Sequence, residues 1–130
     1  MINVIAIITA KSGMRDAILK EFHANMPAVH AEQGCIEYGP AVDAEGIGSF
    51  QAKFGPDTFV VIEKWESPDA LKAHAASPHM AAYAAKTRDM IASRVIHVLS
   101  PRSQRRCSHP PEVSEPAGKT LASSPYPPSG

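Results

Sequence analysis

The chain has 130 residues, a length that suggests one domain with a modest hydrophobic core. Lys and Arg together number 13, as do Asp and Glu, so the composition has no basic excess for nucleic-acid binding and no acidic excess for a solvating tail. The two cysteines, Cys35 and Cys107, form neither a disulfide framework nor a metal-ligand pattern, which fits a reducing compartment.

The N-terminal segment is apolar and short. Residues 2–10 (INVIAIITA) place apolar side chains on both faces of a strand, with no Lys or Arg before them and no small-residue cleavage pattern after them. They predict a buried strand and not a signal peptide. No run in the chain approaches the roughly 18 apolar residues of a membrane span, so we expect a cytoplasmic protein without a membrane partner.

A helix is expected next. Ser12 is a candidate N-cap, and apolar residues then recur at the spacing of one helical stripe: Met14, Ile18, Phe22, Met26 and Val29. Pro27 should kink or break this helix, and Gly34 should end the segment. Residues 35–42 then predict a short strand, and residues 43–57, which are rich in Gly, Asp and Pro, predict a long loop.

The clearest strand is predicted over residues 58–66, where β-branched and aromatic residues follow one another. Ser67-Pro68 and Ser77-Pro78 each place a good N-cap residue before a proline at the first helical position, which is a strong helix-start signal. They predict a short helix over residues 68–75 and a second helix over residues 78–92.

Residues 94–99 supply the last predicted strand, and the composition changes sharply after Ser100. Residues 101–130 contain seven of the twelve prolines and almost no large apolar side chains, so we expect a disordered tail. We interpret its basic patch, RSQRRC, as part of a solvated extension; the alternative is an arm that binds nucleic acid or a partner, for which three arginines make a weak electrostatic footprint. The sequence thus predicts one folded domain over residues 1–100, followed by a Pro- and Ser-rich tail.

This order of elements is the β-α-β-β-α-β order of a ferredoxin-like α+β fold, in which helices cover one face of a four-stranded antiparallel sheet. The other face would be left bare. Because the first and third predicted strands are apolar on both faces, that bare face would be a large exposed patch. We therefore expect it to be covered by the same face of a second copy, in a two-fold homodimer.

Candidate site residues gather around the turn from the third strand into the helices. Glu63 and Trp65 share one face of the strand, since side chains alternate. His74 lies on or beside the inward stripe of the first short helix, and His79 falls one turn before Tyr83 in the next helix. A cavity between sheet and helices is where such a fold has room for a small ligand.

The same stretch carries a family pattern. The segments IEKWESPDALKAHAASPHM, at residues 62–80, and EQGCIEYGP, at residues 32–40, resemble the antibiotic biosynthesis monooxygenase family, and especially its small quinol-monooxygenase-like members. The resemblance covers residues 1–100 and has no counterpart in the tail. It implies a ferredoxin-like fold of the dimeric α/β barrel type. It also implies oxidation of a quinol or polycyclic phenol by dioxygen, with no metal or flavin.

The reaction that the resemblance implies sets its own requirements. Dioxygen is a triplet and reacts slowly with closed-shell molecules, whereas a phenol that has lost a proton is a much better one-electron donor. The protein then needs a base, an apolar pocket and polar groups that stabilise the anion. His74 is the candidate base because its ordinary pKa is near working pH. Trp65 would be an aromatic wall, with Tyr38, Tyr83, His79 and Glu63 as further substrate contacts.

Other interpretations of these residues remain open. Trp65 would also serve as a core or dimer-interface residue, and Glu63 would pair with Arg or Lys across a dimer interface. A haem-degrading activity, found in a related branch, is disfavoured because residues 5–8 offer no Asn and His74 stands where that branch has Trp. An isomerase with His74 as base, or a non-catalytic binding module with a closed pocket or a solvent-facing His74, would also fit the fold.

Overall fold

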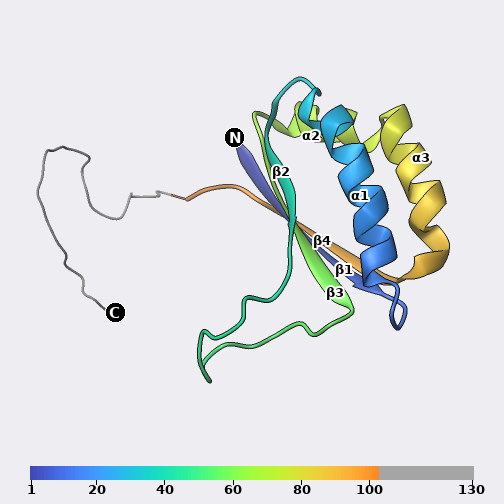
Figure 1. The fold of residues 1–130 in the computed structure, drawn as a ribbon. Coiled ribbons are helices and arrows are strands. Elements are labelled where there is room, and N and C mark those ends of the chain that lie inside the picture. The colour runs from blue at the N-terminus through green and yellow to red at the C-terminus, as the bar shows by residue number, and fades with distance from the viewer. Residues whose placement is uncertain (103–130) are drawn as a thin grey trace, which may run out of the picture.

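The computed structural model describes residues 1–102, which form a four-stranded sheet with its helices on one side (Figure 1). The elements in chain order are β1 (Ile2–Ala10), α1 (Arg15–His30), β2 (Cys35–Ala41), β3 (Thr58–Trp65), α2 (Pro68–Ala75), α3 (Pro78–Thr87), the 3-10 helix η1 (Arg88–Met90) and β4 (Ile91–Leu99). Neighbouring strands are antiparallel, in the order β2-β3-β1-β4. The ferredoxin-like α+β fold is therefore confirmed.

The alternation of β1 separates the core from the second face of the sheet. Every second residue from Ile2 to Ala10 is buried, and the residues between them are only partly covered. β3 repeats the pattern over most of its length, because it lies directly opposite β1 in the sheet. The buried face packs with the α1 stripe, of which Ile18, Phe22 and Val29 are fully covered, at the predicted helical spacing.

The predicted N-cap at Ser12 is wrong. The residue before α1 is Met14, and its side chain makes no cap hydrogen bond. Gly13 adopts φ +77° and donates its backbone N–H to Asp57 Oδ1 at 3.0 Å. The chain therefore turns between Ser12 and the helix, through a left-handed backbone conformation that favours glycine.

Pro27 does not break α1, which continues to His30. The missing N–H removes one helical hydrogen bond, but Val29 on the following turn is fully buried in the core. Burial of the apolar face thus holds the last turn in place despite the proline.

The predicted boundary between the last helix and the last strand is also wrong. α3 ends at Thr87, not at residue 92, and β4 begins at Ile91, not at residue 94. Ile91 pairs with Ala10 of β1, and the intervening residues form η1. The pairing of the two strands sets this boundary, because no glycine or proline in the sequence marks the end of the helix.

The second face of the sheet is uncovered in the single chain. It presents apolar side chains from three strands: Ile5, Ile7, Val60, Ile62, Val95 and Leu99. The segment between β2 and β3 extends away from the helices (Figure 1). Phe50 in this segment is 84% exposed. Such a contiguous apolar face differs from the scattered apolar residues of an ordinary surface.

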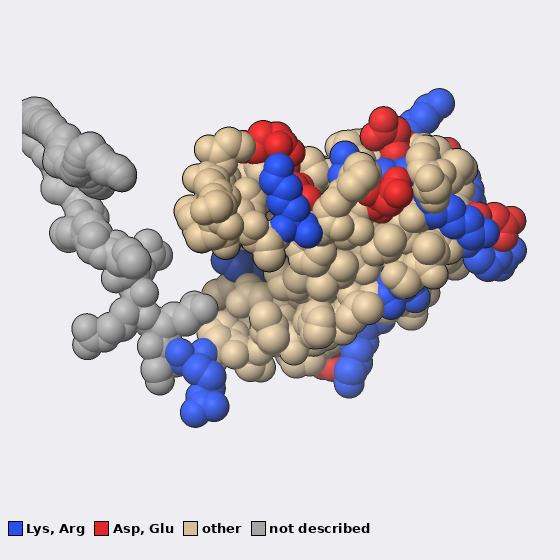
Figure 2. Space-filling model, turned by 90° about the horizontal axis from the view of Figure 1, so that it is seen from below, with Lys and Arg blue, Asp and Glu red and all other residues tan. Residues whose placement is uncertain are grey.

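Neither sign of charge dominates the surface shown in Figure 2. Uncharged residues cover the middle of that view, and positive and negative side chains are mixed around it. This agrees with the neutral composition of the chain. Within residues 1–102, every helix is too short or too polar to span a bilayer. The predicted tail, from residue 103 onward, lies outside the described residues.

Candidate active site

His74 is held by a well-capped helix. Ser67 accepts a hydrogen bond from the Ala70 N–H, and Pro68 occupies the first turn, so α2 begins where the sequence predicts. His74 lies near the other end of α2 and is only 4% exposed. Its ring packs on the indole of Trp65, with 4.7 Å between the ring centroids. A buried imidazole needs a polar partner, and this one has it.

That partner is Glu32, in the turn between α1 and β2. Glu32 Oε2 lies 2.9 Å from His74 Nδ1. The turn reaches α2 because Gly34 has φ +87° and no side chain: a Cβ at this position would lie 2.6 Å from the Cβ of Ala70. The carbonyl of Gly34 also accepts the Glu66 N–H at 2.9 Å. The glycine therefore permits the close approach that brings the Glu32 carboxylate to the histidine.

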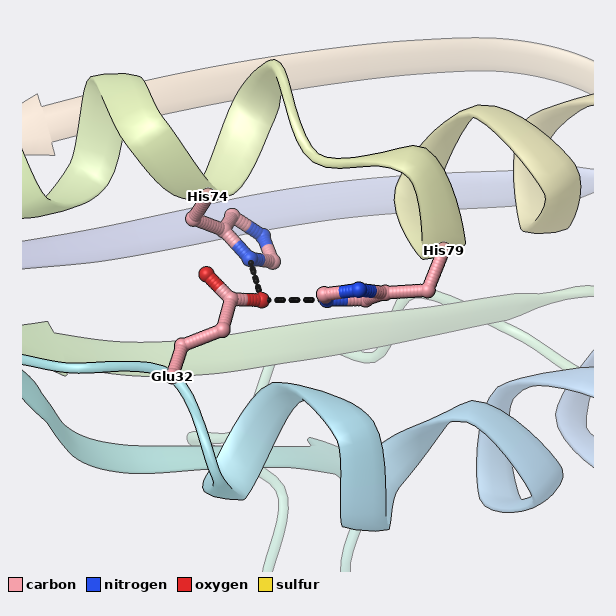
Figure 3. A group of neighbouring side chains, drawn as sticks. All are labelled: Glu32, His74 and His79. Carbon is pink, nitrogen blue, oxygen red and sulfur yellow. Dashed lines mark hydrogen bonds and ion pairs between the residues drawn. The ribbon is translucent and has the colours of Figure 1, made fainter.

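His79 completes the group from the first turn of α3. Its Nε2 lies 2.6 Å from the same Glu32 oxygen, so the carboxylate sits between the two imidazoles (Figure 3). An ionised carboxylate only accepts hydrogen bonds, so both ring nitrogens donate to it. Nδ1 is thus the ring nitrogen that His74 directs to Glu32, and Nε2 is the ring nitrogen left for a ligand. No described residue makes a hydrogen bond to that Nε2.

Glu32, His74 and His79 also have the composition of a metal site, and their ligand atoms all lie within 4.8 Å of one another. The sequence had suggested no such cluster. Two atoms bound to one Zn²⁺ at about 2.1 Å, in tetrahedral geometry, would lie about 3.4 Å apart. The observed oxygen–nitrogen distances of 2.6 and 2.9 Å are shorter and are those of hydrogen bonds. The three groups would have to separate to admit a metal.

His74 lines a cavity of about 810 Å³ between the sheet and the helices. This volume is within the range of small-molecule sites. Apart from its polar groups, the lining consists mostly of aliphatic and aromatic side chains from β1, α1, α2, α3 and β4, including Val4, Ile8, Phe22, Leu71, Met80 and Ile96. The cavity could thus hold an apolar ring system against an imidazole.

Three more of the predicted site residues line this cavity: Tyr38, Glu63 and Tyr83. Trp65 and His79 do not. Trp65 is fully buried behind His74, and His79 contacts the site through Glu32. The tertiary structure therefore gathers all six predicted residues around one place, but only four of them at the cavity wall.

Glu63 faces the helices and not the open face of the sheet, so a dimer-interface ion pair for this residue is wrong. It is 7% exposed, and its Oε1 accepts the Trp65 Nε1–H at 2.9 Å. Burial raises the pKa of the Glu63 carboxyl above its ordinary value, against the lowering effect of the indole hydrogen bond. Glu63 can therefore be protonated at a higher pH than a surface carboxyl.

The two tyrosines keep their hydroxyl protons. Burial, reinforced by the charge of Glu63, raises the pKa of Tyr38 above its ordinary value. Burial also raises the pKa of Tyr83 to about 12, although the Arg94 guanidinium opposes the shift. Tyr38 stacks on Phe22, with 5.1 Å between ring centroids, which fixes its ring in the wall. Both hydroxyls are thus available as hydrogen-bond donors to an anionic substrate oxygen.

Sequence reasoning missed Glu32, although the residue lies within the EQGC segment that it had singled out. The signal was Gly34: a glycine between a helix and a strand indicates a turn of unusual geometry, and its neighbours then become candidates for a site. The sequence also gave no reason to consider Arg88 and Arg94, which line the cavity at its β4 side.

Comparisons with known proteins match the family and the fold of this chain. A family model described as "Antibiotic biosynthesis monooxygenase" matches residues 1–86. "Probable quinol monooxygenase YgiN" of Escherichia coli K12 is 40% identical over 103 residues, covering 78% of this chain and 98% of that protein. Among solved structures, Rv0793 from Mycobacterium tuberculosis has a TM-score of 0.65 at 25% identity, over 81% of this chain and 98% of that one. PA3566 from Pseudomonas aeruginosa has a TM-score of 0.65 at 24% identity, over 78% and 94% of the two chains.

Proposed function

The chain belongs to the antibiotic biosynthesis monooxygenase family, and we propose that it oxidises a small quinol or polycyclic phenol with dioxygen, without a metal or flavin. The main support for the proposal is the environment of His74. One ring nitrogen is bound to a carboxylate, and the residue lines an apolar cavity that would accept an aromatic substrate. The name of the 40% identical E. coli relative supports a quinol as the substrate class.

Each residue has a role in this proposal. His74 Nε2 accepts the proton of a substrate hydroxyl, and Glu32 stabilises the imidazolium that forms. Tyr38 and Tyr83 donate hydrogen bonds to the resulting phenolate. Trp65 is a positioning residue, since it packs on the imidazole and does not line the cavity.

The reaction balances without an external reductant. The phenolate gives an electron to dioxygen, and recombination forms a carbon–oxygen bond at a ring carbon that bears hydrogen. One oxygen atom stays on the ring and the other leaves as water, so that a quinol and dioxygen give a hydroxyquinone and water. The quinol supplies all the electrons that dioxygen requires. The apolar lining would keep water from competing for the anion.

Oxygen uptake by the metal-stripped full chain tests the proposal, with a panel of quinols and anthrones as substrates. We expect uptake well above the autoxidation of each compound, one dioxygen consumed per quinol and no hydrogen peroxide. His74→Ala should lower the rate by about 10²- to 10⁴-fold, the usual contribution of a general base. His23→Ala is the matched control, because His23 is exposed on α1 and bonds only the Leu19 carbonyl.

Three outcomes would contradict parts of this proposal. No uptake with any quinol or anthrone would overturn the monooxygenase. Uptake that is unchanged in H74A would keep the reaction and exclude His74 as its base. Uptake that appears only when a divalent metal is restored would show that the metal-free mechanism is wrong.

A second candidate function is proton transfer on a small carbonyl compound. The observation that favours it is the presence of Glu63, with its raised pKa, on the same cavity as His74, because one group could donate and the other accept a proton. Deuterium exchange into a carbonyl compound without oxygen, together with no quinol oxidation, would favour it. A non-catalytic module is disfavoured, since His74 is buried and the cavity is not filled by side chains.

We also propose that two copies associate through the open face of the sheet. A second copy would cover the apolar face and provide a surface for the segment between β2 and β3, where Phe50 is exposed. Light scattering should give twice the 13.9 kDa mass of the chain. Ile62→Lys, at the centre of the face, should give monomers, whereas Ala82→Lys on the exposed surface of α3 should not. A monomeric wild-type protein at micromolar concentration would overturn this assembly.

A further inference from the structure

The β4 side of the cavity carries positive charge that the proposed chemistry does not use. Arg88 of η1 and Arg94 of β4 both line the cavity. Neither forms an ion pair with a carboxylate of residues 1–102. Glu63 is the one acidic residue in the lining, and its Oε1 accepts the hydrogen bond of the Trp65 indole. The two guanidinium groups are therefore available to a ligand.

The strand register separates this charge from the base. Glu63 pairs with Val4 of β1, and Arg94 pairs with Ile8 of the same strand. Four residues of strand correspond to about 13 Å. Since Val4 and Ile8 both point to the helices, Glu63 and Arg94 face the same cavity from its two ends. The cavity thus has a proton-transfer end, near Glu63 and His74, and a cationic end.

Tyr83 and apolar residues line the cavity together with these charged groups. The Arg94 guanidinium is near enough to Tyr83 to act on the pKa of its hydroxyl. Arginine binds carboxylates through two parallel hydrogen bonds, and both Arg88 and Arg94 are exposed, so a ligand can reach their guanidinium groups. A neutral hydrocarbon would leave this end of the cavity without a partner.

We propose that the substrate is a fused-ring quinol or phenol with a carboxylate on the end remote from the reacting hydroxyl, and that Arg94, assisted by Arg88, binds this carboxylate. Two or three fused rings bridge more of the distance between the ends than one ring does. The proposal rests on the proposed function for the reacting end. Arg94 would then determine specificity and would not take part in proton transfer.

Three naphthalene quinols distinguish the effect of having a carboxylate from the effect of where it lies on the rings. 5,8-Dihydroxynaphthalene-2-carboxylate has the carboxylate on the remote ring, 1,4-dihydroxynaphthalene has none, and 1,4-dihydroxynaphthalene-2-carboxylate has it beside a reacting hydroxyl. We expect kcat/KM for the remote carboxylate to exceed that for the neutral quinol by about 10-fold or more, the size of one charged hydrogen-bond pair. The carboxylate beside the hydroxyl should show no such preference.

The variants test the assignment to Arg94. Arg94→Gln should reduce the preference for the remote carboxylate at least about 10-fold, and Arg88→Gln should reduce it less. Arg102→Gln, the same substitution at an exposed residue outside the cavity lining, should leave the preference unchanged. Equal kcat/KM for the remote-carboxylate and neutral quinols, or a preference that survives R94Q, would overturn the proposal.

Binding of compounds that cannot be oxidised separates this proposal from the proposed function. Calorimetry with 5,8-dimethoxynaphthalene-2-carboxylate and with neutral 1,4-dimethoxynaphthalene needs no turnover. Tighter binding of the carboxylate, lost in R94Q and weakened by salt, would support the anion site even if no quinol were oxidised. Equal binding of both, with active turnover of neutral quinols, would overturn the anion site and leave the monooxygenase intact.

Discussion

Replacing Glu32 with Gln tests whether its carboxylate positions His74. In the wild-type protein, Glu32 Oε2 accepts hydrogen bonds from His74 Nδ1 at 2.9 Å and from His79 Nε2 at 2.6 Å. Gln has nearly the same shape, but it has no negative charge and one of its two terminal atoms is a donor. E32Q therefore keeps the packing of the turn and weakens both hydrogen bonds.

The size of the effect follows from these contacts. A hydrogen bond to a charged group contributes about 1.5–3 kcal/mol. The Glu32 side chain is only 13% exposed, so water screens little of this interaction. His74 becomes charged in the transition state. If E32Q loses this hydrogen-bond energy there, kcat/KM should decrease by about 10- to 150-fold.

Oxygen uptake and NMR together measure this prediction. The decrease should appear in kcat, since Glu32 acts on the base and does not line the cavity. The ¹⁵N spectrum of His74 should show the Nδ1–H tautomer in the wild-type protein and a mixture in E32Q. A purely structural role would not change the tautomer.

Glu21→Gln is the matched control for E32Q. Glu21 lies on α1 and approaches Lys86 at 3.9 Å, away from the cavity lining, so its neutralisation should leave kcat and the His74 tautomer unchanged. Wild-type kcat and an unchanged tautomer in E32Q, in a protein that unfolds at the normal temperature, would refute the positioning role of Glu32.

Two further predictions concern stability. Burial raises the pKa of Glu63 above its ordinary 4.5, so the native state retains a proton that the unfolded state loses. The bound proton stabilises the native state at low pH, and this stabilisation is lost as pH rises from 4.5 through the native pKa. Glu63→Gln keeps an acceptor for the Trp65 indole and should remove this loss. In urea unfolding, the free energy of unfolding of E63Q minus that of wild type should increase with pH, by about 1.4 kcal/mol for each unit of pKa shift. A difference that stays constant between pH 4 and 8 would contradict the assignment. Gly34→Ala should destabilise the protein by about 2–4 kcal/mol, because the new Cβ combines a left-handed backbone with a clash against Ala70. Gly13→Ala introduces the same left-handed backbone strain, but the space around residue 13 is open, so it should lower the free energy of unfolding by only about 1 kcal/mol. Equal losses of stability in the two variants would exclude the clash with Ala70.

Local signals in the sequence were sufficient for most of the secondary structure. Ser67 and Ser77 cap α2 and α3 as predicted, by accepting the N–H groups of Ala70 and Met80. Such caps depend on residues within one helical turn, so they are visible without a tertiary structure. The end of α3 has no local signal. It is set by the pairing of β4 with β1, whose residues lie about 80 positions away in the sequence.

For the site, the residue pattern was enough to identify the available chemistry: a histidine in a capped helix, and Glu63 and Trp65 on one face of a strand. It did not determine which face of that strand turns toward the helices, because a strand that is apolar on both faces gives no preference. Nor did it join Glu32 to His74, 42 residues further along the chain. These points depend on how whole elements pack in three dimensions. The contact of Gly34 with α2 brings the carboxylate to the imidazole, and the strand register sets Arg94 apart from both.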